Sequence, residues 1–187
     1  MRKLVLSMGV SLDGLVARPG RHGGGGWGLP PEDPRLKELK LEWLRNTSLH
    51  LMGRVTYEEM AEFWPASDDP YAAPMNNIPK VVFSKTLERA DWPESEIARG
   101  DLASEISELK RKGDKDMLAW GGAKFAQSLS RLGLVDEYRL VLQPIALGVG
   151  FPLFKDLSAP LRLQLVDAQT FDSGAALHIY RRTPAVS

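Results

Sequence analysis

Cysteine is absent from this chain of 187 residues, and its absence removes several kinds of chemistry at once. The chain has no thiol that could form a disulfide, act as a nucleophile or bind a metal ion. The three histidines, His22, His50 and His178, stand far apart and do not have the spacing of metal ligands. We therefore expect no metal site. Because nothing indicates oxidative folding, we expect a cytoplasmic location.

An excess of charge and a long apolar run are also missing. The 24 basic residues balance the 24 acidic ones, so the composition gives no support for nucleic acid or an anionic membrane as a partner. No stretch approaches the roughly 20 apolar residues that a membrane helix needs. The apolar run near the N-terminus is broken by Ser7, Gly9 and Asp13 and lacks a cleavage-like end, so we interpret it as a strand and not a signal peptide.

The order of the sequence patterns predicts one α/β domain over residues 1–187. Strand-like runs alternate with helical patterns over the first two-thirds of the chain, which favours a mostly parallel sheet with right-handed crossovers. The expected strands there are 2–10, 48–53, 80–84, 94–98 and 116–120, and the expected helices are about 34–46 with Asp33 as N-cap, 56–63, 101–112 with Asp101 as N-cap, and one after Gly122. Further on, apolar residues alternate, and the turn "DSG" (172–174) predicts an antiparallel hairpin.

The stretch "LMGRVTYEEM" (51–60) places a glycine, an arginine and a helix start directly after a strand. Thr56 and Glu59 have the T-x-x-E spacing of a capping box, which predicts the helix start. Gly53 would allow a ligand close to the backbone, while Arg54 and Thr56 add a cation and a hydroxyl. Helix N-termini beyond strand ends attract phosphate groups, so this turn is a candidate phosphate site. The alternative is an ordinary strand-to-helix turn.

Two further strand ends carry similar chemistry. Ser84 and Lys85 follow the strand "KVVF", and Gly121, Gly122 and Lys124 follow the strand "DMLAW" where a helix begins. A dinucleotide with an extra 2′-phosphate would use all three turns, the glycine-rich one for the pyrophosphate and a separate basic one for the 2′-phosphate. The alternative is three solvated turns with surface lysines.

The run "GGGGWG" (23–28) formally matches the G-x-G-x-x-G dinucleotide motif, but we do not assign it that role. The motif requires a preceding strand and an immediately following helix, whereas "RPGRH" precedes this run and "LPP" follows it. Its composition predicts a flexible loop. The functional alternative is a flap over a site, with Trp27 as an aromatic contact to the substrate.

Asp13 follows the first strand in the turn "SLDG". Asp-Gly is a strong turn former, so this carboxylate could simply accept hydrogen bonds from its own loop. Alternatively, it points into a cleft and orients a polar heterocycle. The sequence leaves both interpretations open.

Several segments in order resemble the dihydrofolate-reductase-like superfamily, and in particular its branch related to the reductase domain of riboflavin biosynthesis. They are "LVLSMGVSLDGLVA", "LMGRVTYEEM", "PKVVFSKT", "LAWGGAKFAQSLSRLGLVDEYRLVLQPIALGVGFPLF" and the closing hairpin. The resemblance spans nearly the whole chain. It implies a three-layer α/β/α fold on a central mixed, mostly parallel sheet, NADPH as hydride donor, and a homodimer.

The resemblance also implies roles for individual residues. Asp13 would be the catalytic residue near the nicotinamide and the substrate. The implied cofactor contacts are Gly53, Arg54 and Thr56 at the phosphates, Ser84 and Lys85 at the 2′-phosphate, and Gly121, Gly122 and Ala123 at the pyrophosphate.

One feature of folate reductases is missing. They carry a carboxylate on the helix before the G-R-x-T strand, and the corresponding place here falls at about Leu39. Glu38 and Glu42 are close in sequence but face other directions on a helix. Arg18, Arg21 and Arg35 flank the glycine loop and could contact a ribose phosphate, although a solvated loop is the simpler explanation.

The sequence therefore supports two functional hypotheses. In the first, the protein is an NADPH-dependent reductase of a small heterocycle, either a riboflavin-pathway pyrimidine carrying a ribose phosphate or a pterin, with Asp13 or a water molecule completing protonation. In the second, the same fold is a dimeric NADP(H)- or ligand-binding scaffold without turnover.

Overall fold

The computed structural model describes residues 1–20 and 27–183. Its strands are β1 (Leu4–Ser11), β2 (Leu15–Ala17), β3 (Thr47–Gly53), β4 (Lys80–Phe83), β5 (Ser95–Ala98), β6 (Asp116–Trp120), β7 (Glu137–Gln143), β8 (Phe151–Pro152), β9 (Leu163–Thr170) and β10 (Ala176–Arg182). Its helices are α1 (Pro34–Arg45), α2 (Arg54–Phe63), α3 (Ala72–Asn77), α4 (Leu102–Arg111) and α5 (Ala123–Arg131), with a short 3-10 helix at Trp64–Ala66.

Eight strands form one sheet in the order β5-β4-β3-β6-β1-β7-β10-β9. The strands from β5 to β7 run parallel, whereas β10 pairs antiparallel with both β7 and β9. The remaining two strands, β2 and β8, pair separately as a small antiparallel ribbon. This arrangement confirms the predicted mixed, mostly parallel sheet with a C-terminal antiparallel hairpin.

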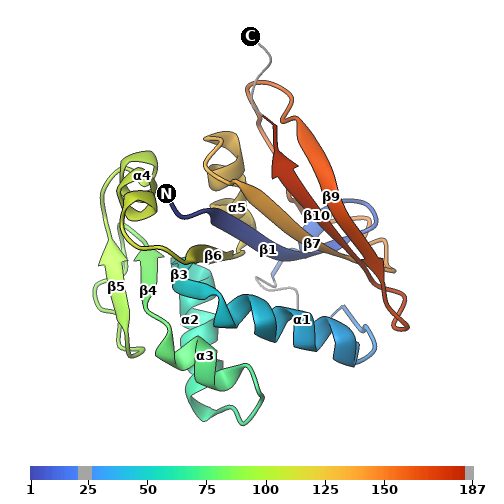
Figure 1. Cartoon of the computed structure of the whole chain (residues 1–187), viewed down its shortest axis with the longest axis horizontal. Helices are drawn as coiled ribbons and strands as arrows, with labels where there is room; N and C mark the ends of the chain where they lie inside the picture. The colour runs from blue at the N-terminus through green and yellow to red at the C-terminus, as the bar shows by residue number, and fades with distance from the viewer. Residues whose placement is uncertain (21–26, 184–187) are drawn as a thin grey trace.

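Helices cover both faces of the sheet and complete the predicted three-layer α/β/α fold. Figure 1 shows α1, α2 and α3 on one side of the strands and α4 and α5 on the other. The buried side chains divide in the same way: Ile106 and Phe125 of α4 and α5 pack in one cluster, and Leu44, Tyr57 and Met75 of α1 to α3 pack in another. In residues 1–20 and 27–183, no helix is long and apolar enough to cross a membrane.

The helix starts follow the sequence at α1 and α4 but not at α2. The carboxylates of Asp33 and Asp101 accept hydrogen bonds from the first turns of α1 and α4, as expected for N-caps. The capping box at Thr56 is wrong, because α2 already begins at Arg54, and Gly53 occupies the N-cap position without a side-chain cap. The Thr56 hydroxyl instead donates a hydrogen bond of 2.8 Å to the carbonyl oxygen of Gly121. A tertiary partner has therefore replaced the local cap.

A histidine in the middle of the sheet is kept neutral by its surroundings. His50 on β3 is fully buried, and its Nδ1 accepts a hydrogen bond of 2.9 Å from the indole N–H of Trp120. Burial, together with the nearby cation of Lys80, lowers the pKa of His50 to about 3.

We predict that His50 makes the folded state sensitive to mild acid. The unfolded chain protonates a histidine near pH 6.5, whereas the folded state keeps His50 neutral down to about pH 3. The unfolded state therefore binds more protons below pH 6.5, and the free energy of unfolding falls as the pH is lowered, by at most about 1.4 kcal/mol per pH unit from this group.

Urea denaturation of the wild type and His50→Gln at pH 7, 6 and 5 would measure this effect. The variant should show the smaller loss of stability over this range. His178→Gln, which removes a histidine from β10, is the control and should keep the wild-type slope. An unchanged slope in His50→Gln would contradict the assignment.

Candidate active site

The candidate site lies where the chain leaves neighbouring parallel strands in opposite directions. After β3, the chain passes through α2 and on to β4, whereas after β6 it passes through α5 and crosses β1 to reach β7. As a result, α2 and α5 lie on opposite faces of the sheet (Figure 1). The crevice at the ends of β3 and β6 is lined by the starts of both helices. In open α/β sheets, such a switch point is the usual place for a ligand.

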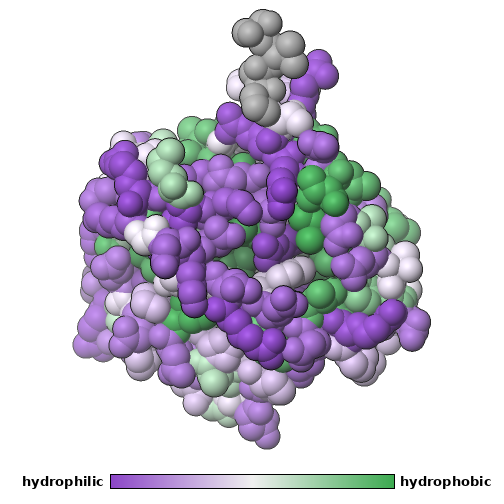
Figure 2. Space-filling model, in the orientation of Figure 1, coloured by the Kyte–Doolittle hydropathy of each residue, from purple (hydrophilic) through white to green (hydrophobic). Residues whose placement is uncertain are grey.

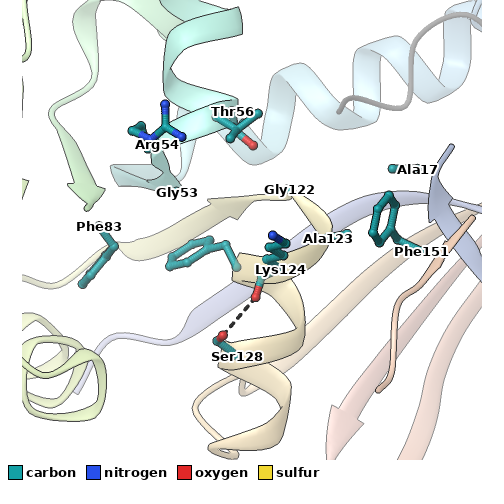
Figure 3. A pocket seen from close by; sticks show the side chains of 12 residues that line it. Ala17, Gly53, Arg54, Thr56, Phe83, Gly122, Ala123, Lys124, Ser128 and Phe151 are labelled. Atoms are coloured by element: carbon teal, nitrogen blue, oxygen red, sulfur yellow. Dashed lines mark hydrogen bonds between the residues drawn. The ribbon is translucent and has the colours of Figure 1, made fainter. Parts of the chain in front are cut away.

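A cavity of about 430 Å³ occupies this crevice, and we call it the outer cavity. Its wall includes the starts of both helices and three phenylalanines, with the β2–β8 ribbon at one end. The residues used below are Gly53, Arg54, Thr56, Phe83, Gly122 and Lys124. Figure 3 shows Arg54 and Thr56 from α2 on one side of the cavity and Lys124 from α5 on the other.

Glycine at both helix starts lets the backbone form the wall of the outer cavity. Gly122 has φ of +96°, a conformation that favours glycine, and a Cβ at this position would lie 2.6 Å from the Thr56 hydroxyl oxygen. A Cβ at Gly53 would lie 3.3 Å from Cβ of Phe125. Neither Gly53 nor Gly122 provides a side-chain cap, so the first backbone N–H groups of both helices are left for a ligand or water.

Two cations add to the positive ends of these helices. The Arg54 guanidinium pairs with Glu58 one turn later, with 2.9 Å from Nη1 to each carboxylate oxygen, and both side chains are close to half exposed. An exposed pair of this kind contributes little to stability, so an incoming anion can compete with Glu58. Lys124 lies in the first turn of α5. The outer cavity therefore combines an apolar wall with donors and cations suited to a phosphate.

A second cavity of about 190 Å³, the inner cavity, adjoins the outer one because Thr56 and Gly122 line both. Its walls come from the middle of β1, the end of β6 and one side of α1 and α2. Gly121 lies here, and a Cβ at this position would collide with the Met8 side chain at 2.3 Å. Among the described residues that line the inner cavity, Lys40 and Glu59 carry the charges.

The sequence interpretation missed Lys40 and Glu59. The resemblance to folate reductases points to a carboxylate near Leu39. However, Glu38 pairs with Arg45 on the exposed surface, and Glu42 is absent from the described wall of the inner cavity. Lys40 lies four residues after the buried Leu36, which places it toward the apolar side of α1. That spacing was visible in the sequence and indicates a lysine facing inward.

Ser84 and Lys85 lie beyond the described walls of both cavities. The Ser84 hydroxyl accepts hydrogen bonds from the backbone N–H groups of Thr86 and Leu87, at 3.2 and 2.9 Å, and so closes the turn after β4. Their neighbour Phe83 does line the outer cavity and stacks on Phe125, with ring centroids 5.4 Å apart. The turn thus begins at the edge of the outer cavity.

Asp13 accepts hydrogen bonds from a loop that is distant in the sequence, a partner that neither of its two interpretations named. Its carboxylate accepts hydrogen bonds from the Ser11 hydroxyl at 2.5 Å and from the backbone N–H groups of Leu147 and Gly148 at 3.1 and 2.7 Å. These bonds lower the pKa of Asp13 to about 2. It is absent from the described walls of both cavities, and so low a pKa makes it a poor proton donor near neutral pH.

Trp27 is buried and is likewise absent from both described walls. Most of the expected glycine flap, residues 23–26, lies outside the described residues, as do Arg21 and His22. Among the residues that are described, no cluster of three or more His, Asp or Glu side chains could hold a metal ion.

Comparisons with known proteins agree with this architecture. The chain is 29% identical over 184 residues to the uncharacterized protein YyaP of Bacillus subtilis (strain 168), covering 96% of this chain and 94% of that protein. A putative riboflavin biosynthesis protein from Shewanella sp. PV-4 has a similar structure, with a TM-score of 0.79 at 23% identity over 97% of this chain and 99% of that one.

The fold also resembles dihydrofolate reductase from Enterococcus faecalis, solved in complex with NADP(H), with a TM-score of 0.63 at 16% identity over 97% of both chains. Residues 2–177 match the family described as the RibD C-terminal domain. With nearly its whole length covered by this match, the chain belongs to the RibD C-terminal domain family.

Proposed function

We propose that this protein is an NADPH-dependent reductase of a small heterocyclic substrate. The observation that carries the proposal is the pair of uncapped helix N-termini with two cations at the outer cavity, directly beside a smaller polar cavity. Membership of the RibD C-terminal domain family supports it, because members of this family are commonly NADPH reductases. The substrate that the family favours is a pyrimidine, with a pterin as the alternative.

The residues of the outer cavity fit a dinucleotide phosphate. A Cβ at Gly53 or Gly122 would press against Phe125 or Thr56, so glycine at both positions lets the walls of the cavity pack closely around the two helix starts. Arg54, Thr56 and the first N–H groups of α5 would hold the phosphates, and Ser84 and Lys85 would extend the site toward a 2′-phosphate beyond Phe83. When bound, NADPH would supply a hydride at its nicotinamide ring. The role of the protein is then to orient the substrate and exclude water.

Titration with NADPH and NADH, followed by tryptophan fluorescence, tests the cofactor assignment. We expect saturable binding with NADPH ahead of NADH. Arg54→Ala and Lys124→Ala should weaken both nucleotides about tenfold or more, because each removes a charge-assisted phosphate contact of roughly 1.5–3 kcal/mol. Lys85→Ala should weaken NADPH alone. Lys112→Ala, at the exposed end of α4, is the control, and equal effects in all four variants would contradict the proposal.

We predict that a side chain at position 122 lowers both the stability of the protein and its affinity for NADPH. Gly122→Ala adds a backbone cost of about 1–3 kcal/mol, because φ of 96° with ψ of 114° lies outside the regions that residues with a side chain prefer, and it also brings Cβ against the Thr56 hydroxyl. Gly148 is a matched control, since its φ is +72° but nothing lies within 4 Å of a Cβ there. Gly122→Ala should therefore destabilise more than Gly148→Ala in urea denaturation and should lose NADPH affinity. Equal losses in the free energy of unfolding for Gly122→Ala and Gly148→Ala would show that the contact with the Thr56 hydroxyl does not affect stability.

The alternative function is a scaffold that binds NADP(H) without turnover. It is favoured by the hydrogen bonds from Leu147 and Gly148 to Asp13, which leave its carboxylate unsuited to acid catalysis. Loss of NADPH absorbance with pyrimidine, pterin and simple carbonyl compounds separates the two functions. Binding of NADPH without consumption across this panel would favour the scaffold.

We also propose that the protein forms a homodimer through the β9 side of the sheet. Leu165 and Val166 on this edge strand are 49% and 39% exposed, and Figure 2 shows hydrophobic surface where β9 and β10 lie. An unpaired apolar edge is a liability that pairing removes. Light scattering should give twice the chain mass for the wild type and a lower mass for Leu165→Lys. A monomeric wild type would contradict the proposal.

A further inference from the structure

The wall of the inner cavity includes a cation, Lys40, to which the proposed function assigns no role. Lys40 projects from α1 into the wall of the inner cavity, and its side chain is 25% exposed. The residues that β1 and the end of β6 contribute to the wall carry no charge. Any ligand in the inner cavity would thus meet a single described positive charge.

Two residues outside the inner cavity hold this ammonium in place. The Lys40 ammonium is paired with one carboxylate oxygen of Glu32, and the other oxygen of Glu32 accepts a hydrogen bond of 2.8 Å from the Tyr71 hydroxyl. Burial, and then the hydrogen bond to Glu32, raises the pKa of Tyr71, so its hydroxyl remains a donor at any ordinary pH. An ammonium has three donors, and Glu32 uses one of them.

Resting on the proposed reductase function, we propose that Lys40 is the residue that stabilises and protonates the substrate heteroatom during reduction. The substrate would then present a carbonyl oxygen or imine nitrogen to Lys40. Glu32 and Tyr71 would be positioning residues that act through the lysine.

The reduction would need only a hydride, a proton from Lys40 and water. When bound, NADPH would supply the hydride to the carbon of a C=O or C=N bond, and the π-electron pair would move onto the heteroatom. That atom becomes anionic and takes a proton from the Lys40 ammonium, leaving a neutral amine that water reprotonates. A fixed cation beside the atom where negative charge develops favours the transition state over the ground state. Asp13 is not needed for this step.

A second charged residue of the inner cavity narrows the substrate class. Glu59, one turn after Thr56 on α2, also lines the cavity and supplies an acceptor. A ring that carries both a carbonyl or imine acceptor and N–H donors would satisfy both charges. A cyclic amide has this arrangement, whereas a simple ketone lacks the donors.

A phenolate probe tests Lys40 without requiring turnover. 4-Nitrophenolate is a flat ring whose oxyanion resembles the charge that forms on the heteroatom, and its ionisation is visible by absorbance. With NADP⁺ present, we expect the wild type to bind the phenolate in preference to the neutral phenol, and so to lower the apparent pKa of the bound probe. Lys40→Met should lose this preference at least tenfold, and Lys40→Arg should recover part of it.

Lys37→Met is the matched control. Lys37 lies one turn earlier on α1 and also forms an ion pair, to Asp69 at 2.9 Å, but it is absent from the inner cavity wall. It should leave the bound-probe pKa unchanged. Glu32→Gln should remove the ion pair that positions the Lys40 ammonium. It should therefore reduce the preference for the phenolate, but by less than Lys40→Met does.

The role of Lys40 and the proposed reductase function can fail independently in this experiment. If NADP⁺ binds but the phenolate preference is absent or survives in Lys40→Met, the role of Lys40 is wrong and the reductase proposal stands. If the phenolate preference depends on Lys40 but neither NADPH nor NADP⁺ binds, the inner cavity is an oxyanion site and the cofactor proposal fails. An equal loss in Lys37→Met would reduce Lys40 to a structural role.

Discussion

The hydrogen bond from Thr56 to the carbonyl oxygen of Gly121 is the interaction on which the site depends. It ties the first turn of α2, on one face of the sheet, to the end of β6, from which α5 leaves on the other face. The two helix starts can approach this closely only because Gly122 has no side chain. The Thr56 hydroxyl and the absence of a Cβ at Gly122 thus determine how closely the two helix starts approach each other. Both cavities share this point, so their geometry is coupled.

Much of the fold could be predicted because its signals are local. Strand-helix alternation, the carboxylate caps Asp33 and Asp101, and the period-two hairpin each depend on residues a few positions apart, and the structure follows them. The capping box at Thr56 failed for the opposite reason. Its hydroxyl had a competing partner 65 residues away, and sequence spacing carries no information about that partner.

The same distinction applies to the candidate site. Gly53, Arg54 and Gly122 were found because a glycine at a strand-to-helix turn is a local pattern with a physical cause. The spacing of Lys40 from Leu36 indicates a lysine facing inward, but the cavity that it meets could not be predicted, because β1 and β6 approach α1 only in the folded chain. The role of Asp13 could not be decided from the sequence, because its hydrogen-bond donors include backbone N–H groups of a loop more than 130 residues later.

Charged side chains can gather at one site even in a chain with no net charge. Acidic partners neutralise many cations of this protein at its surface, and Glu58 does so for Arg54 in an exposed pair that an anion can displace. Lys40 differs, because its partner Glu32 is itself held by Tyr71 and lies outside the inner cavity. An anion in the outer cavity would therefore compete with the exposed carboxylate of Glu58, whereas a ligand in the inner cavity would meet a cation that Glu32 already holds. On the proposed function, the first arrangement suits reversible cofactor binding, and the second suits a group that must be in place before charge develops.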